Sequence, residues 1–289
     1  MSPLAIGLVL LAAVLHAAWN LGAKKARADH HFVLASAAGV ALLWAPAAFY
    51  FGWNQVPHWP AAAWACAMAS AILHLVYFNA LLAGYRAADL NVVYPVARGS
   101  GPLVSSVAAT LLFGEHLGLT GVAGLTAIVS GIFLIAAGPS LWRGGADPRR
   151  NVGIAWGALT GLMIAGYTLV DGYAVKMLLV SPLVIDWMGN VLRVPFMLPA
   201  VLRDRAGFMP ALRRQWPYLL MMAVFSPAAY VLVLYAMTLA PISRVAPMRE
   251  LSMLVAALLG GQLLKEGERH WRLLGAAFIA GGVMALSTG

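Results

Sequence analysis

The chain has 289 residues, of which 62% are apolar and only 10% are charged, whereas about a quarter of an average soluble domain is charged. A water-soluble domain of this length cannot bury so much apolar surface, so the composition excludes the soluble classes and indicates an integral membrane protein. The net charge of +9 does not indicate nucleic-acid binding, because the basic residues lie between apolar runs, and the single Cys66 excludes an intramolecular disulfide.

Runs of about 20 apolar residues, each long enough to cross about 30 Å of hydrocarbon, recur along the chain. The first, at about 4–22, is not interpreted as a signal peptide, because no positive charge precedes it and no small-residue cleavage site follows it. His16, Trp19 and Asn20 share one face of this span, and lipid cannot satisfy their hydrogen bonds. We expect this face to line a cavity; the alternative is an interfacial aromatic with helix–helix hydrogen bonds.

The second and third spans differ in polarity. The span at about 32–52 carries no charge and is expected to support the others. The span at about 61–84 places His74 and Tyr77 on one helix face. A buried histidine in such a position is as typical of a structural role as of a binding role.

The fourth span, within 91–115, contains Tyr94 and Arg98 one turn apart. A charge inside a span costs about 2.5–3.5 kcal/mol on insertion scales, so Arg98 is expected to face a cavity or a partner. Glu115 is interpreted as an architectural residue that serves the start of the next span. That fifth span, at about 117–138, has glycines at helical spacing and is expected to be structural.

A hydrophilic segment at 140–151 precedes five further spans. Their ranges are about 152–174, 182–202 and 217–240, a ninth span after these, and a tenth at about 271–288. Spans six, eight and nine carry polar residues, which are Tyr167, Asp171, Tyr230, Arg249 and Glu250. Span seven holds Asp186, Asn190 and Arg193, which we interpret as an internal ion pair with its amide neighbour.

The chain is one unit of about 150 residues written twice. A shift of 151 superposes Arg98 on Arg249 and Glu115 on Glu266. We therefore predict two repeats, 1–139 and 152–289, joined by a linker at 140–151. With five spans each, the repeats must have opposite orientations in the bilayer. The predicted fold is an all-α integral membrane protein of ten transmembrane helices in two inverted five-helix repeats, an architecture typical of secondary transporters.

The distribution of Lys and Arg predicts the orientation. Loops after odd-numbered spans hold fourteen of these residues and loops after even-numbered spans hold two. The positive-inside rule therefore places the segments 23–31, 140–151 and 203–216 in the cytoplasm and both termini outside, in the periplasm of a bacterial host.

Several short motifs occur in a recognisable order. They are H-A-A-W-N at the end of the first span, F-G-E at 113–115 and L-A-P-I-S-R-V-A-P at 239–247. Together with the duplicated five-span unit, they make the chain resemble the EamA family of the drug/metabolite transporter superfamily over nearly its whole length. The resemblance implies a ten-helix carrier that works by alternating access, often an exporter of small metabolites, in the bacterial inner membrane. It also implies a central cavity lined mainly by spans one, three, four, six, eight and nine.

Twelve residues are candidates for binding a small-molecule substrate: His16, Trp19, Asn20, His74, Tyr77, Tyr94, Arg98, Tyr167, Asp171, Tyr230, Arg249 and Glu250. Arginines can hold a carboxylate with two hydrogen bonds, and the carboxylates can bind an amino group. This mixture favours a zwitterion such as an amino acid, with lipophilic-cation efflux as the alternative. A third interpretation is that the charges neutralise one another within the protein.

Other functional classes lack their signatures. The histidines do not form a metal-ligand pattern, the only cysteine lies inside a span, and no Walker motif is present. We therefore predict no enzyme activity, no metal, no cofactor and no nucleic-acid partner. A non-transport membrane sensor is a less favoured alternative. The sequence leaves proton coupling and homodimer formation open.

Overall fold

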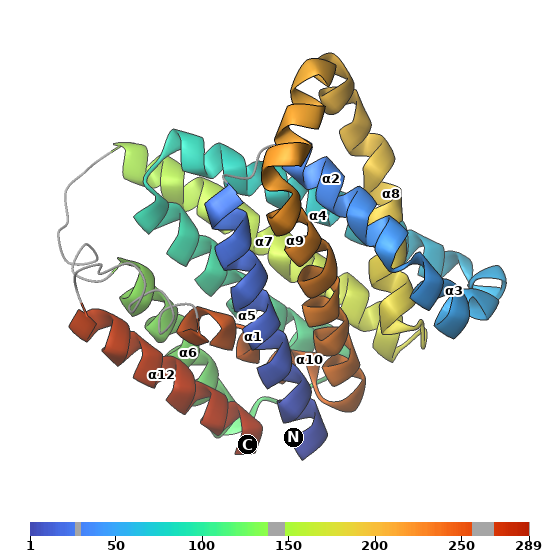
Figure 1. The fold of residues 1–289 in the computed structure, drawn as a ribbon. Coiled ribbons are helices and arrows are strands. Elements are labelled where there is room, and N and C mark those ends of the chain that lie inside the picture. The colour runs from blue at the N-terminus through green and yellow to red at the C-terminus, as the bar shows by residue number, and fades with distance from the viewer. Residues whose placement is uncertain (27–29, 138–147, 256–268, 289) are drawn as a thin grey trace.

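A computed structural model describes residues 1–26, 30–137, 148–255 and 269–288, and every regular element in these ranges is a helix (Figure 1). The helices of the first half are α1 (Pro3–Ala26), α2 (His30–Leu43), α3 (Ala45–Gly52), the 3-10 helix η1 (Trp53–His58), α4 (Ala61–Ala87), α5 (Leu90–Phe113) and α6 (Gly118–Ala137). Those of the second half are α7 (Pro148–Lys176), α8 (Pro182–Arg203), α9 (Arg205–Leu239), α10 (Ile242–Met248) and α12 (Arg269–Thr288).

Six of these helices are long and apolar enough to cross a membrane, or seven if the bent pair formed by α2 and α3–η1 is one span. The predicted seventh span, α8, does not meet that criterion, and it contains Asp186 and Arg193. The tenth, α12, offers only a shorter apolar helix at Leu273–Thr288, and the ninth runs partly outside the described residues. The all-helical membrane fold is confirmed, whereas the count of ten spans stays a prediction.

Two segments differ from the expectation of uninterrupted spans and separate loops. The second span is bent by 43° between α2 and α3, where Pro46 lacks the backbone N–H that would continue the helix. The predicted loop at 203–216 is wrong, since α9 begins at Arg205, directly after α8 ends. Asp204 makes this sharp corner possible because its carboxylate accepts a hydrogen bond from the backbone N–H of Gly207, which caps α9.

The fourth and ninth predicted spans, although related by the repeat, are built differently. Helix α5 runs without a break through Pro95 and Pro102. Helix α10 instead ends at Met248, and Arg249 and Glu250 form a turn before helical structure resumes at 251–255. The break sets Arg249 and Glu250 at the junction of two helical segments.

Helices of the first half pack against helices of the second half in pairs, and the repeat relates one pair to another. Helix α1 packs on α9, and its repeat counterpart α7 packs on α4. Helix α6 packs on its own counterpart α12 along two close contacts, Gly124 with Gly282 and Gly131 with Gly275. A Cβ atom at Gly131 would lie 2.5 Å from the carbonyl oxygen of Gly275, so no larger residue fits this crossing. Because the earlier glycine of α6 meets the later glycine of α12, the two helices run antiparallel.

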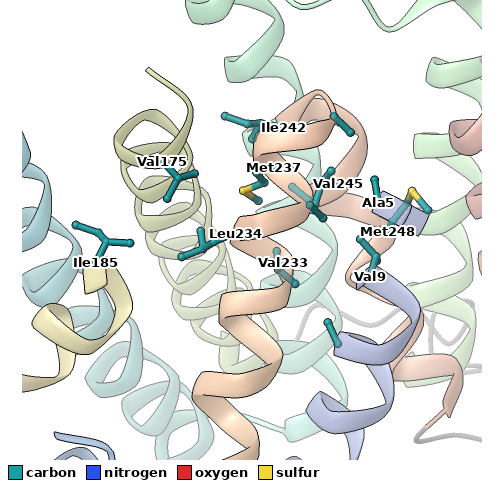
Figure 2. Close-up of a cluster of buried hydrophobic side chains, with 14 of the residues drawn as sticks. Ala5, Val9, Val175, Ile185, Val233, Leu234, Met237, Ile242, Val245 and Met248 are labelled. Atoms are coloured by element: carbon teal, nitrogen blue, oxygen red, sulfur yellow. The ribbon is translucent and has the colours of Figure 1, made fainter. Parts of the chain in front are cut away.

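A hydrophobic core joins α1, α7, α8, α9 and α10 (Figure 2). Ile242, Val245 and Met248 of α10 are fully buried in it. They lie among Val9 of α1, Met237 of α9 and other labelled side chains. This core fixes the short helix α10 against both halves of the protein.

Candidate functional site

Towards the middle of α7 and α9, polar side chains take the place of the apolar core. On α7, Val175 belongs to the core, and Asp171 and Tyr167 follow one and two turns deeper. On α9, Leu234 belongs to the core and Tyr230 follows one turn deeper. The polar cluster therefore begins directly beneath the apolar layer.

One part of this polar cluster is an ion pair between the two halves. Arg98 of α5 places Nη2 2.7 Å from Oε2 of Glu250, and both side chains are buried. The same guanidinium donates a longer hydrogen bond of 3.4 Å to the hydroxyl of Ser252. Arg98 is thus directly neutralised by a carboxylate, as expected for a charge inside a membrane span.

Arg249 has a different environment, although the repeat makes it equivalent to Arg98. Its Nε lies 3.9 Å from Oε1 of Glu250, which is too far for a hydrogen bond. Its guanidinium carbon lies 5.8 Å from the ring centroid of Tyr167, within the range of a cation–π interaction. The residue is only 4% exposed, and its Nε has no hydrogen-bond partner among the described residues.

Aromatic side chains connect Arg249 to a buried carboxylate. Tyr167 stacks on His74 with ring centroids 3.9 Å apart and meets Tyr230 edge to face. The hydroxyl of Tyr230 donates a 2.6 Å hydrogen bond to Oδ2 of Asp171. Asp171 is 1% exposed, and its Oδ1 has no hydrogen-bond partner in the described chain. A cation and a carboxylate, each with an unused polar atom, therefore flank Tyr167 and its aromatic neighbours.

Tyr77 completes the aromatic group, with its ring centroid 5.9 Å from that of Tyr167. Tyr94 interacts electrostatically with Arg98 and Glu250, and His16 interacts with both arginines. Trp19 meets His16 edge to face at 4.8 Å. Eleven of the twelve candidate residues are thus linked to one another by contacts or by electrostatic interactions.

Asn20 is the residue that the structure does not join to the others. Its side chain is exposed, and its amide donates to the backbone carbonyl of His16 on its own helix. A role for Asn20 in binding stays a prediction.

Sequence reasoning missed Ser70 and misjudged the network on α8. The backbone carbonyl of Ser70 lies 2.9 Å from Nδ1 of His74 and fixes that ring; the four-residue spacing was the available signal. On α8, no described contact pairs Asp186 with Arg193 directly. Asn190 instead stands between them, accepting from Arg193 at 2.6 Å and donating to Asp186 at 3.4 Å.

Glu115 lies outside the membrane spans and caps a helix in the other half of the protein. Its Oε1 accepts from Nζ of Lys176 at 2.9 Å and from the backbone N–H of Ile242 at 2.8 Å. Its Oε2 accepts from the backbone N–H of Ser243 at 2.8 Å. The expectation that Glu115 serves the start of the next span is therefore wrong, because α10 provides nearer donors. Its repeat counterpart Glu266 lies outside the described residues.

These contacts govern the charge of Glu115. Burial alone raises the pKa of the carboxyl, but the hydrogen bonds from Lys176, Ser243 and Ile242 outweigh burial and hold the pKa below its ordinary value of 4.5. Glu115 is therefore ionised near neutral pH and forms a charge-assisted contact with each donor.

The described residues contain one group with metal-ligand spacing, formed by His30, His31 and Asp204. Its ligand atoms lie within 4.8 Å of one another. Ordinary contacts account for its geometry, since Asp204 caps α9 and His31 lies 3.0 Å from the backbone carbonyl of Asp204. The group lies at the corner between α8 and α9, away from the polar cluster.

Comparisons with known proteins agree with this architecture. The profile of the EamA-like transporter family matches the chain twice, over residues 3–137 and 151–288. Among solved structures, one described as "Crystal structure of protein" matches with a TM-score of 0.75 and 16% identity, covering 98% of this chain and 96% of that one. At this identity the likeness shows the fold alone. No curated protein gives a significant match.

Proposed function

Because the chain belongs to the EamA-like transporter family and is an integral membrane transporter, we propose that it carries a small zwitterion by alternating access. The favoured substrate is an amino acid or a related amine-acid metabolite, and the favoured direction is export across a bacterial inner membrane. The polar cluster around Tyr167 is the proposed binding site, at the interface between the two repeats.

Ten spans in two inverted repeats remain the proposed topology. The antiparallel crossing of α6 and α12 supports it, because these helices are repeat counterparts. The segments after α5, α7 and α9 meet at one end of the molecule, around Glu115. Those after α1 and α8 meet at the other end, where Gln215 bonds to the carbonyl of Ala26 and His31 to that of Asp204. Among these five spans, those of odd and even number end at opposite ends, which supports the proposed topology.

The observation that carries the substrate proposal is that Arg249, with no carboxylate within hydrogen-bond distance, and Asp171 lie on either side of Tyr167, each with a buried atom that lacks a partner among the described residues. A buried polar group without a partner costs free energy, so such groups are retained where a ligand completes them. A substrate carboxylate would accept from the guanidinium of Arg249, and a substrate ammonium would donate to Asp171. Tyr167 would lie between them, against the apolar part of the substrate.

The two arginines then have different roles, although the sequence made them equal candidates. Arg98 already has a carboxylate partner at 2.7 Å and is proposed to hold Glu250 in place. Arg249 is proposed to be the residue that binds the substrate carboxylate. Glu250 lies within hydrogen-bond distance of Arg98 and not of Arg249, so the guanidinium of Arg249 is the one proposed to meet a substrate carboxylate.

Reconstituted liposomes test the proposal. Purified protein is first screened by thermal shift against amino acids, amines and organic anions, and the best ligands are then followed in uptake assays. Arg249→Gln should weaken binding of a zwitterion by at least about tenfold and leave lipophilic cations nearly unaffected. Asp171→Asn should weaken amines and zwitterions but spare simple carboxylates.

Two results contradict this reading of the site. If the wild-type protein moves only lipophilic cations, the aromatic group and Asp171 form a cation site and the efflux alternative holds. If Arg249→Gln transports every solute normally, the charges neutralise one another and the zwitterion proposal fails.

A further inference from the structure

Among the described residues, Glu115 makes the densest set of polar contacts between the two halves. It follows α5 in the first half, and all three of its donors belong to the second half. Lys176, at the end of α7, also donates to the carbonyl of Ala240 at 3.3 Å. Glu115 and Lys176 together thus join the ends of α5, α7 and α9 and the start of α10, and we call this pair the latch.

The latch acts on a helix that a second contact already holds to α5. The hydroxyl of Ser106 donates to the carbonyl of Ser243 at 2.8 Å, so both polar groups of the Ser243 backbone bond to the first half. Both contacts connect the first repeat to the second. A movement of one half against the other at this end must break them.

The latch closes over the apolar layer, and the polar cluster lies beneath that layer. From Lys176 along α7, Val175 is in the layer, and Tyr167 lies nine residues, or about 13 Å, deeper. The α10 segment that the latch holds supplies Ile242 and Val245 to the same layer (Figure 2). Access to the cluster from this end therefore requires α10 to move away from α1, α7 and α9.

We propose that the latch between Glu115 and Lys176 holds this end of the substrate path closed, and that its release is the step that opens the path at this end. The inference rests on the alternating-access part of the proposed function and adds the residues that control one gate. Glu115 and Lys176 are positioning residues, since neither touches the polar cluster.

The arrangement explains why a charge pair is used here. Hydrogen bonds to an ionised carboxylate are about twice as strong as neutral ones, yet water can replace each of them once the contact opens. A purely apolar contact would instead expose apolar surface on opening. Charged contacts at the rim over an apolar layer allow a closed state that is stable and an open state that is solvated.

Side-specific labelling tests the latch without any substrate. Ser252→Cys, introduced together with Cys66→Ala, places a thiol in the polar cluster at a position that is 3% exposed. In right-side-out and inside-out vesicles, a small impermeant methanethiosulfonate reports from which side the thiol is reached. We expect Glu115→Gln to raise the labelling rate from the latch side at least about threefold, at the expense of the opposite side.

Lys176→Met is the milder second variant, because it removes the ion pair and leaves both backbone N–H contacts of Glu115. It should shift labelling in the same direction by a smaller factor. Asp204→Asn is the matched control, since Asp204 also caps a helix with its carboxylate but at the opposite end. It should not raise labelling from the latch side.

A purely structural role predicts lower thermal stability for Glu115→Gln and Lys176→Met with unchanged sidedness of labelling, and that result overturns the latch. Failure of the transport proposal is separate, because a wild-type protein that moves no tested solute can still show the labelling shift. Conversely, wild-type transport with unshifted labelling in both variants overturns the latch alone.

Discussion

Glu115 links protonation to stability at the scale of a single residue. Its pKa is held below the ordinary value of 4.5, so its contribution to folding is complete above that value. The contribution is lost as the pH falls through the lower pKa of the folded state. The charged group that contacts it is Lys176, whose Nζ lies 2.9 Å from Oε1.

We therefore expect the stability difference between the wild type and Glu115→Gln to depend on pH. Near pH 7 the wild type should be more stable by about 2 kcal/mol, because the charged acceptor makes stronger hydrogen bonds than the amide. Thermal unfolding in detergent measures the difference, which should shrink steadily below about pH 4.5. A difference that is the same at neutral and acidic pH contradicts an ionised Glu115.

For single residues, the sequence predicted whether a side chain lies inside the protein, but not which partner it contacts there. Arg98 and Asp171 were expected to lie inside because lipid cannot hold a charge. The difference between Arg98 and Arg249 could not be predicted, since it depends on which guanidinium Glu250 approaches. The partners of Glu115 were equally hidden, because they lie more than 60 residues away along the chain.

Helix pairing is the feature that matters most at the scale of elements. The contact between α6 and α12 depends on backbone approach at Gly131 and Gly275, where a Cβ would meet a carbonyl oxygen. Glycine spacing indicated close packing in the sequence, but not which helix would be the partner. The break between α10 and Arg249 was also not predictable, since its counterpart α5 tolerates Pro95 without interruption.

Gly131→Leu should separate α6 from α12 and lower the stability by about 2–4 kcal/mol, because the side chain overlaps backbone that cannot move aside. Gly281→Ala on α12 is the matched control, since its Cβ would meet nothing within 4 Å. It should be neutral or slightly stabilising, because alanine favours a helix more than glycine does. Equal loss in the two variants, measured as thermal stability in detergent, argues against the crossing.

The arrangement of the whole molecule carries the orientation prediction. Figure 1 shows both termini at one end, and the N-terminal ammonium donates to the carbonyl of Ser287 at 2.9 Å. The corner between α8 and α9 lies at the other end. The two termini and the basic corner segment thus lie at opposite ends of the described part of the molecule.

Cysteine labelling in intact cells checks the orientation, with Cys66→Ala as the background. Met209→Cys lies in the basic corner segment and should resist an impermeant maleimide, as expected for a cytoplasmic position. His58→Cys, in η1 at the opposite end, should react rapidly. The reverse pattern contradicts the prediction that both termini lie outside.

Repeat number and membrane class followed from the sequence at this scale, because composition and internal similarity are properties of the chain itself. The relative placement of the halves depended on contacts between distant residues and needed the structure. The bend between α2 and α3 and the helical corner at 203–216 have local causes, Pro46 and the cap by Asp204, whose effect on the helices only the structure shows.

Glu250 has a consequence for the energetics of the transport cycle. In two inverted repeats of identical sequence, the inward-open and outward-open states would be related by symmetry and equal in free energy. The first repeat has Gly99 where the second has Glu250, so in the proposed cycle this carboxylate is one of the differences that remove that degeneracy. A bias of only about 1.4 kcal/mol gives one resting state a tenfold excess. A duplicated chain can thus acquire a preferred resting state through one charge, whereas the solute gradients set the direction of net movement.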